Sequence, residues 1–272
     1  MRNSIIGIVI MLMALNGFAA KDKEDEVKKD KVEKICNQGI LLQRMVKDFM
    51  MMGIDLQKKE SQMDLDECVA DYEMTRLFFE DIEADEKTMS AIEKADEKWV
   101  RFRMEVTDKV TPENAYELFK TNESLLNTNE QLLQSSCQGC DLNSISGYLL
   151  SKELEMLSER IAMLYFAHSW GIKKEVSLRY FSDAVRNFEM KLNQLKSLKN
   201  MNAQIESKLM TLEFEWQNAK QLFGRMNFGK HENKAVYEAC LSFSKSFNSV
   251  GAMYFDQSEK DKITGQSPTS PN

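Results

Sequence analysis

The chain has 272 residues, of which 43% are hydrophobic and 29% charged, so it is long enough to fold around one or two hydrophobic cores. Its formal net charge of −7 disfavours nucleic acid, which needs a concentrated basic face, and adhesion to an anionic membrane surface. The sequence also lacks a phosphate-cradling glycine loop, a G-x-S-x-G motif and a His/Cys metal cluster, so we expect neither an enzyme nor a metal site or cofactor.

Residues 1–20 have the composition of a secretory signal peptide. Arg2 supplies the positive charge, and the apolar run over residues 5–15 is too short to span a bilayer comfortably. Small residues follow, so we expect cleavage near Ala19 or Ala20. The alternative is an uncleaved N-terminal anchor. We therefore expect an exported, soluble protein, located in a bacterial periplasm and without membrane insertion after cleavage.

The rest of the chain has the features of an all-helical protein. Between residues 20 and 255 the only proline is Pro112, which with Thr111 makes a good helix start. Apolar residues recur at helical spacing, and Gly53 and Gly171 are expected to end two of the helices. We expect a first helix over residues 35–52 that residues 21–34 extend as a solvated end. Further helices are expected over residues 55–82, 86–106, 112–133, 150–170, 174–198 and 202–223, and a last one around 236–250.

A helical segment occurs twice, over residues 35–133 and 149–254. Arg44 and Arg160 begin the two copies of a spaced motif: a pair of an aromatic residue and glutamate follows each arginine, and a lone tryptophan comes later. These residues are Tyr72-Glu73 and Trp99 in the first copy, and Phe188-Glu189 and Trp216 in the second. Four amphipathic helices per copy predict two tandem antiparallel four-helix bundles.

The corresponding domain boundaries follow from the repeat. The signal over residues 1–20 precedes a first module over 21–135 and a second over 142–256. A polar linker over residues 136–141 joins them and carries a C-x-x-C motif. Residues 257–272 are rich in polar residues and proline at their end, so we expect a disordered tail.

The segments around the two arginines resemble a family signature. They are similar to the end of helix one in the N-terminal sensor domain of type IV pilus methyl-accepting chemotaxis transducers, which is related to the periplasmic domain of nitrate/nitrite sensor kinases. The resemblance covers nearly the whole mature chain, twice, and rests on Leu42-Gln43-Arg44-Met45, on Met156-Leu157-Ser158-Glu159-Arg160-Ile161-Ala162, and on the downstream aromatic-Glu-Met, tryptophan and Glu/Asn-rich segments.

This resemblance implies two sensor modules without an output domain, a small ligand, and a membrane receptor or sensor kinase as partner. In the nitrate-sensing relatives, an arginine five residues before the Arg44/Arg160 position holds the anion. Here those positions are Gly39 and Glu155. We therefore do not expect nitrate to bind by that route, since Glu155 would repel an anion.

Arg44, Arg160 and His168 are the candidate ligand-binding residues. A guanidinium donates a planar fork of hydrogen bonds that suits a small anion or carboxylate. The alternative for each arginine, which is the commoner arrangement, is an ion pair with a neighbouring helix. His168 lies on a packing stripe and is expected in the core or a pocket, whereas His231 has no ligand-like partner in the sequence.

The five cysteines have two expected roles. Cys137 and Cys140 form the C-x-x-C of the linker, where a structural disulfide is expected, with a redox pair or half of a metal site as alternatives. Cys36, Cys68 and Cys240 are expected to be buried packing residues, with a Cys36–Cys68 bridge as the alternative. The methionines at positions 45 and 50–52 are expected in the core rather than at copper.

The sequence therefore predicts an exported sensor-like protein that binds a ligand or a partner. A structural or adaptor protein of the periplasm with no small ligand is the alternative. A metal or redox protein that uses the C-x-x-C motif and the methionines is a third, weaker interpretation.

Overall fold

A computed structural model describes residues 30–80, 85–137, 142–199, 201–226 and 231–264. Within these residues every regular element is a helix, so the predicted all-α fold is confirmed. None of the described helices is long and apolar enough to cross a membrane. The predicted signal peptide lies outside the described residues.

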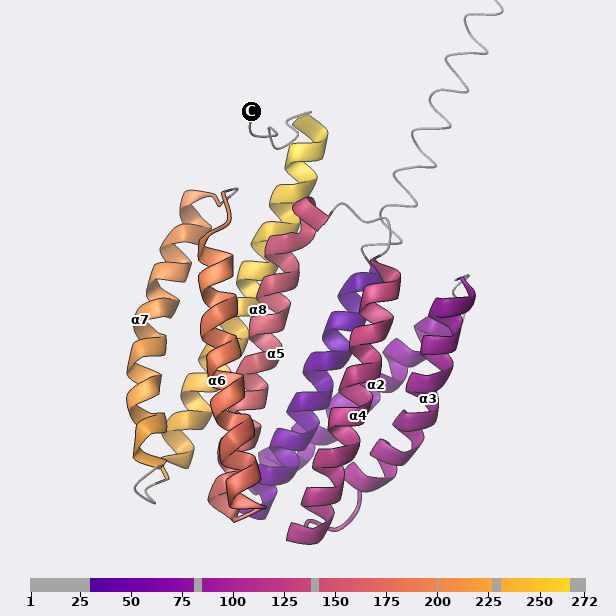
Figure 1. Ribbon diagram of the computed structural model, residues 1–272, viewed down its shortest axis with the longest axis vertical. Helices are drawn as coiled ribbons and strands as arrows, with labels where there is room; N and C mark the ends of the chain where they lie inside the picture. The colour runs from indigo at the N-terminus through magenta and orange to yellow at the C-terminus, as the bar shows by residue number, and fades with distance from the viewer. Residues whose placement is uncertain (1–29, 81–84, 138–141, 200, 227–230, 265–272) are drawn as a thin grey trace, which may run out of the picture.

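Each repeat contributes four helices (Figure 1). In the first repeat these are a helix over residues 30–53, α2 (Lys58–Glu80), α3 (Glu86–Val106) and α4 (Pro112–Ser136). In the second they are α5 (Leu142–Trp170), α6 (Lys174–Lys196), α7 (Ala203–Arg225) and α8 (Asn233–Thr264). Because α8 continues to Thr264, the expected disordered tail from residue 257 is wrong for its first residues; residues 265–272 are not described.

Short-range signals start and end these helices. Thr111 accepts a hydrogen bond from the backbone N–H of Asn114, and Pro112 occupies the first turn of α4, as predicted. Asn202 caps α7 in the same way. Gly171 follows α5 with a φ of 88°, a conformation that glycine adopts without strain.

The duplicated motif makes the same contact in both repeats. The indole N–H of Trp99 donates to Glu73 at 3.0 Å, and that of Trp216 donates to Glu189 at 3.3 Å. All four residues were singled out by their spacing in the sequence. The structure therefore confirms that the spaced motif marks two copies of one packing arrangement.

Further groups around the indoles are also repeated. Tyr72 stacks on the first indole and Phe188 on the second, with ring centroids 3.9 Å apart in both. One turn after each tryptophan, a cation donates to the same glutamate: Arg103 at 2.9 Å in the first repeat and Lys220 at 2.8 Å in the second. Each repeat thus joins its second and third helices by an aromatic stack and a charged hydrogen bond.

The first helix of each repeat lies at the centre of the molecule. The helix over residues 30–53 and α5 run side by side in the same direction, with the other helices of each repeat outside them (Figure 1). From Gln38 to Met52, every residue except Arg44 is buried, and α5 is buried continuously from Ile161 to Ala167. Helices that are enclosed on all sides in this way form the core of a larger assembly.

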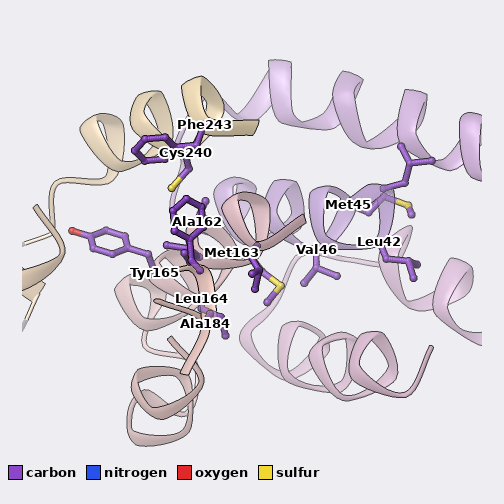
Figure 2. Close-up of a cluster of buried hydrophobic side chains, with 14 of the residues drawn as sticks. Leu42, Met45, Val46, Ala162, Met163, Leu164, Tyr165, Ala184, Cys240 and Phe243 are labelled. Atoms are coloured by element: carbon purple, nitrogen blue, oxygen red, sulfur yellow. The ribbon is translucent and has the colours of Figure 1, made fainter. Parts of the chain in front are cut away.

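One hydrophobic core runs through both repeats. It includes Leu42 and Val46 of the first repeat and Met163, Leu164 and Phe243 of the second. Figure 2 shows Val46 and Met163 near one another, between Leu42 at one end of the drawn cluster and Phe243 at the other. The two four-helix modules are therefore packed against one another along their first helices.

Candidate functional site

Arg44 and Arg160 meet at the boundary between the repeats. The Nε of Arg44 donates to Oε1 of Glu159 at 3.4 Å, and Nη1 of Arg160 donates to Oε1 of Gln43 at 3.3 Å. Each arginine thus contacts the residue that precedes the other arginine. This crossed pattern indicates an approximate twofold relation between the two central helices at this level.

The α4 side of this boundary is closed around Arg160. Glu123 of α4 accepts from both terminal nitrogens of Arg160, at 2.6 and 2.8 Å, and the Arg160 side chain is only 12% exposed. A bidentate pair of this kind uses the whole guanidinium fork. Both arginines therefore form the ion pair with a neighbouring helix that was the alternative to ligand binding: Arg160 with Glu123 of α4, and Arg44, through its Nε alone, with Glu159 of α5.

The α8 side is built from different residues. Asn122 of α4 accepts a hydrogen bond from Gln43, and Ser244 of α8 donates one to Glu159. Because Gln43 and Glu159 each precede the arginine of their repeat, Asn122 and Ser244 occupy equivalent places. The residue after Asn122 is Glu123, whereas the residue after Ser244 is Lys245. A lysine cannot pair with an arginine, so the group that neutralises Arg160 has no counterpart on the side of Arg44.

Arg44 therefore remains accessible. Its side chain is 29% exposed, and its contact with Glu159 is its only hydrogen bond among the described residues. It lines a hollow of about 400 Å³ between the helix over residues 30–53, the start of α2, α5 and α8. A second hollow, of about 450 Å³, extends from Arg44 along α2. The two hollows share Arg44, Glu155 and Asn248, and we call them together the Arg44 groove.

The floor of the Arg44 groove is a buried ion pair. The ammonium of Lys47 donates to Glu159 at 2.9 Å, and both side chains are almost fully buried. Burial alone would raise the pKa of Glu159, but Lys47 and Arg44 beside it lower that pKa below its usual value. Glu159 is therefore a fixed negative charge that holds the two central helices together.

Glu155, which was expected to repel an anion, also has a cationic partner. Glu155 accepts a hydrogen bond from Lys152 at 3.0 Å, and Lys152 in turn donates to Asn248 at 2.7 Å. Burial raises the pKa of Glu155, while Lys152 and Arg44 act to lower it. The exposed Lys245 and Asn248 leave the α8 wall of the groove cationic and polar.

His168 lies away from this groove, near the C-terminal end of α5. Its Nδ1 is 3.0 Å from Nε2 of His231, so the only two histidines of the chain contact one another. Burial, the neighbouring imidazole and Lys174 lower the pKa of His168, and burial and Lys174 lower that of His231. This pair could not be predicted from the sequence, because 63 positions separate the two residues.

The cysteine predictions have mixed outcomes. Cys36, Cys68 and Cys240 are thiols, so the alternative Cys36–Cys68 bridge is wrong. Burial raises the pKa of Cys36 and of Cys68 to about 12, as expected for packed thiols. Cys137 is the C-cap residue of α4, but Cys140 is not described, so their disulfide stays a prediction. The methionines at positions 45 and 50–52 are buried in the core, as predicted.

No family model, curated protein or solved structure matches this chain. The resemblance to transducer sensor domains therefore rests on the residues quoted for it.

Proposed function

We propose that this chain is an exported, sensor-like binding protein that takes a small carboxylate or oxyanion against Arg44, in the groove between the two repeats. The observation that carries the proposal is the difference between Glu123 and Lys245 at equivalent places. The first fills the fork of Arg160, and the second adds a cation to the hollow that Arg44 lines, opposite the acidic residues of α2.

The chemistry of the groove supports an anionic ligand. Among the described residues, neither terminal nitrogen of Arg44 donates a hydrogen bond, and a carboxylate or oxyanion accepts such a pair of hydrogen bonds in the plane of the guanidinium. Lys245 and Asn248 of α8 line the same hollow. Of the acidic groups around Arg44, Glu159 pairs with Lys47 and Glu155 with Lys152, whereas Asp48 and Asp64 line the same hollow on the side of α2.

A ligand at this place can affect the packing of the two repeats. Arg44 belongs to a central helix of the first repeat, and Lys245 belongs to α8 of the second. A ligand held by both would favour one relative position of the helices, and small interhelical shifts of this kind transmit signals in helical proteins. We propose that a membrane receptor or a sensor kinase reads this state in the periplasm.

The adaptor alternative also has an observation in its favour. Val100 and Met104 on α3, and Met210 and Phe214 on α7, are large apolar side chains that are mostly exposed. The two helices lie at opposite edges of the molecule (Figure 1). Exposed apolar side chains at both edges suit two docking faces for other proteins.

A ligand screen separates the two proposals. The mature chain is tested by thermal shift with small anions, carboxylates and amino acids. A ligand at 100 times its dissociation constant adds about 2.7 kcal/mol to the free energy of unfolding, which raises the melting temperature measurably. We expect a carboxylate or oxyanion to give this shift in the wild type and in Arg186→Ala, a change at an exposed arginine of α6.

Arg44→Ala is expected to lose the shift. A selective shift that survives Arg44→Ala would contradict the proposed site. No shift with any member of the panel would favour the adaptor alternative.

A further inference from the structure

Three potential metal ligands meet beside the Arg44 groove. Asp48 lies on the helix over residues 30–53, and Asp64 and Cys68 lie one turn apart on α2. One carboxylate oxygen from each aspartate and the sulfur of Cys68 all lie within 4.8 Å of one another. Ligand atoms around a single tetrahedral ion are separated by roughly 3–4 Å, so small side-chain movements would bring these three into coordination distance.

Asp48 gives an independent sign that a group is missing from this cluster. Its side chain is only 2% exposed, and its Oδ2 has no hydrogen-bond partner among the described residues apart from a proton shared with the carboxyl of Asp64. A buried carboxylate oxygen without a partner is costly and calls for an ion, a water or a proton. The nearest cation is Lys47, which is 3.5 Å from Oδ1 but only 2.9 Å from Glu159.

The net charge of the groups around the cluster favours a divalent cation. Two cationic groups, Arg44 and Lys47, face the carboxylates of Asp48, Asp64 and Glu159. If Cys68 binds as a thiolate, it adds a fourth negative charge. A divalent cation would then bring the whole group to neutrality, and its binding would release the thiol proton to solvent.

We propose that Asp48, Asp64 and Cys68 bind one divalent transition-metal ion, Zn²⁺ by preference. Mg²⁺ and Ca²⁺ favour oxygen ligands alone, and copper(I) favours thiolates and thioethers, whereas Zn²⁺ accepts mixed sulfur and oxygen ligands in four-coordinate sites. Asp48 and Asp64 also line the Arg44 groove, so a water from the groove can fill the fourth position. The ion would join α2 to the central helix of its repeat.

Co²⁺ tests the site directly, because a thiolate bound to Co²⁺ gives a near-ultraviolet charge-transfer band. The reduced, chelator-treated mature protein is titrated with Co²⁺, followed by displacement with Zn²⁺. We expect one equivalent to produce the band, and Cys68→Ser to abolish it. Asp48→Asn and Asp64→Asn should each weaken binding by about 100-fold or more, since even loss of a group that only orients a ligand costs 10- to 100-fold.

Matched controls exclude the other sources of a signal. The double variant Cys137→Ser/Cys140→Ser removes the C-x-x-C motif, and Asp66→Asn changes an exposed acid of α2; both should keep the band. Asp64 is only partly buried, so Asp64→Asn tests the site even where Asp48→Asn lowers stability, and circular dichroism checks the fold of each variant.

Three results would overturn the metal site. These are no band in the wild type, a band that survives Cys68→Ser, and an unchanged affinity in Asp64→Asn. The last result would favour a proton shared between the two aspartates as the group that fills the site. Lys245→Ala separates this proposal from the ligand proposal, because it should weaken carboxylate binding and leave the Co²⁺ band unchanged.

Discussion

The surroundings of Arg44 and Arg160 differ although the two arginines occupy the same place in the repeat. Arg160 is enclosed by a bidentate pair with Glu123, while Arg44 makes one hydrogen bond, to Glu159, and opens onto a groove. The difference comes from one position in the fourth helix of each repeat, where Glu123 stands in α4 and Lys245 in α8. A duplicated fold can thus enclose one copy of a residue and leave the other copy partly exposed.

Removal of Glu159 should have the largest effect on stability. Glu159→Ala leaves the buried ammonium of Lys47 with only Asp48 at 3.5 Å, and breaking one half of a buried pair costs about 3–5 kcal/mol of the free energy of unfolding. On the other side of the boundary, Glu123→Ala should cost only about 1–2 kcal/mol, because Glu123 is partly exposed. Urea unfolding of both variants measures the difference. Equal losses would contradict the distinction between a buried and a partly exposed pair.

The two tryptophans test how similar the repeats are away from the groove. Trp99→Phe and Trp216→Phe each remove an indole N–H that donates to a glutamate, and we expect each to lose about 2 kcal/mol. The two losses should agree within about 0.5 kcal/mol, since the contacts are the same in both repeats. Chemical denaturation checks this, and a large loss in one repeat alone would show that the repeats differ in their cores too.

The histidine pair should give the smallest effect, confined to the second repeat. The pKa values of His168 and His231 are lowered in the folded protein, so the unfolded chain binds protons first as the pH falls. Their contribution to stability is therefore complete above the ordinary value of 6.5 and is lost as the pH falls from there through the lowered pKa values. Unfolding midpoints measured across this range should decrease less steeply with acidification in His231→Gln than in the wild type. Parallel pH profiles would contradict the assignment.

Much of the fold could be predicted from the sequence, because its signals are short in range. Helical periodicity, Pro112 in the first turn of α4 and Gly171 after α5 act on neighbouring residues, and the structure has the helices where these signals indicate. The spacing from Arg44 to Trp99 and from Arg160 to Trp216 identified the repeat. The central packing of the first helices could not be predicted, since a helix buried on all sides shows little amphipathic contrast.

The candidate site was only partly predictable. The motif led to Arg44 and Arg160, but their different partners lie 115 and 37 positions away along the chain. The equivalence of Glu123 and Lys245 was hidden, because the segment between the tryptophan and the fourth helix is longer in the second repeat. Asp48, which with Lys47 interrupts the apolar residues from Met45 to Met52, was the one available signal of the acidic cluster with Asp64 and Cys68.

The most direct test of the difference between the two arginines is the affinity of Lys245→Glu for the carboxylate or oxyanion that stabilises the wild type most, measured by isothermal titration calorimetry. This change copies Glu123 onto the α8 side, so the new carboxylate should pair with Arg44 and compete with the ligand. We predict that the dissociation constant rises at least about tenfold, or about 1.4 kcal/mol, while stability changes by no more than about 0.5 kcal/mol, because Lys245 is exposed. An unchanged dissociation constant in a folded Lys245→Glu protein would contradict the account, since the ligand would then bind elsewhere.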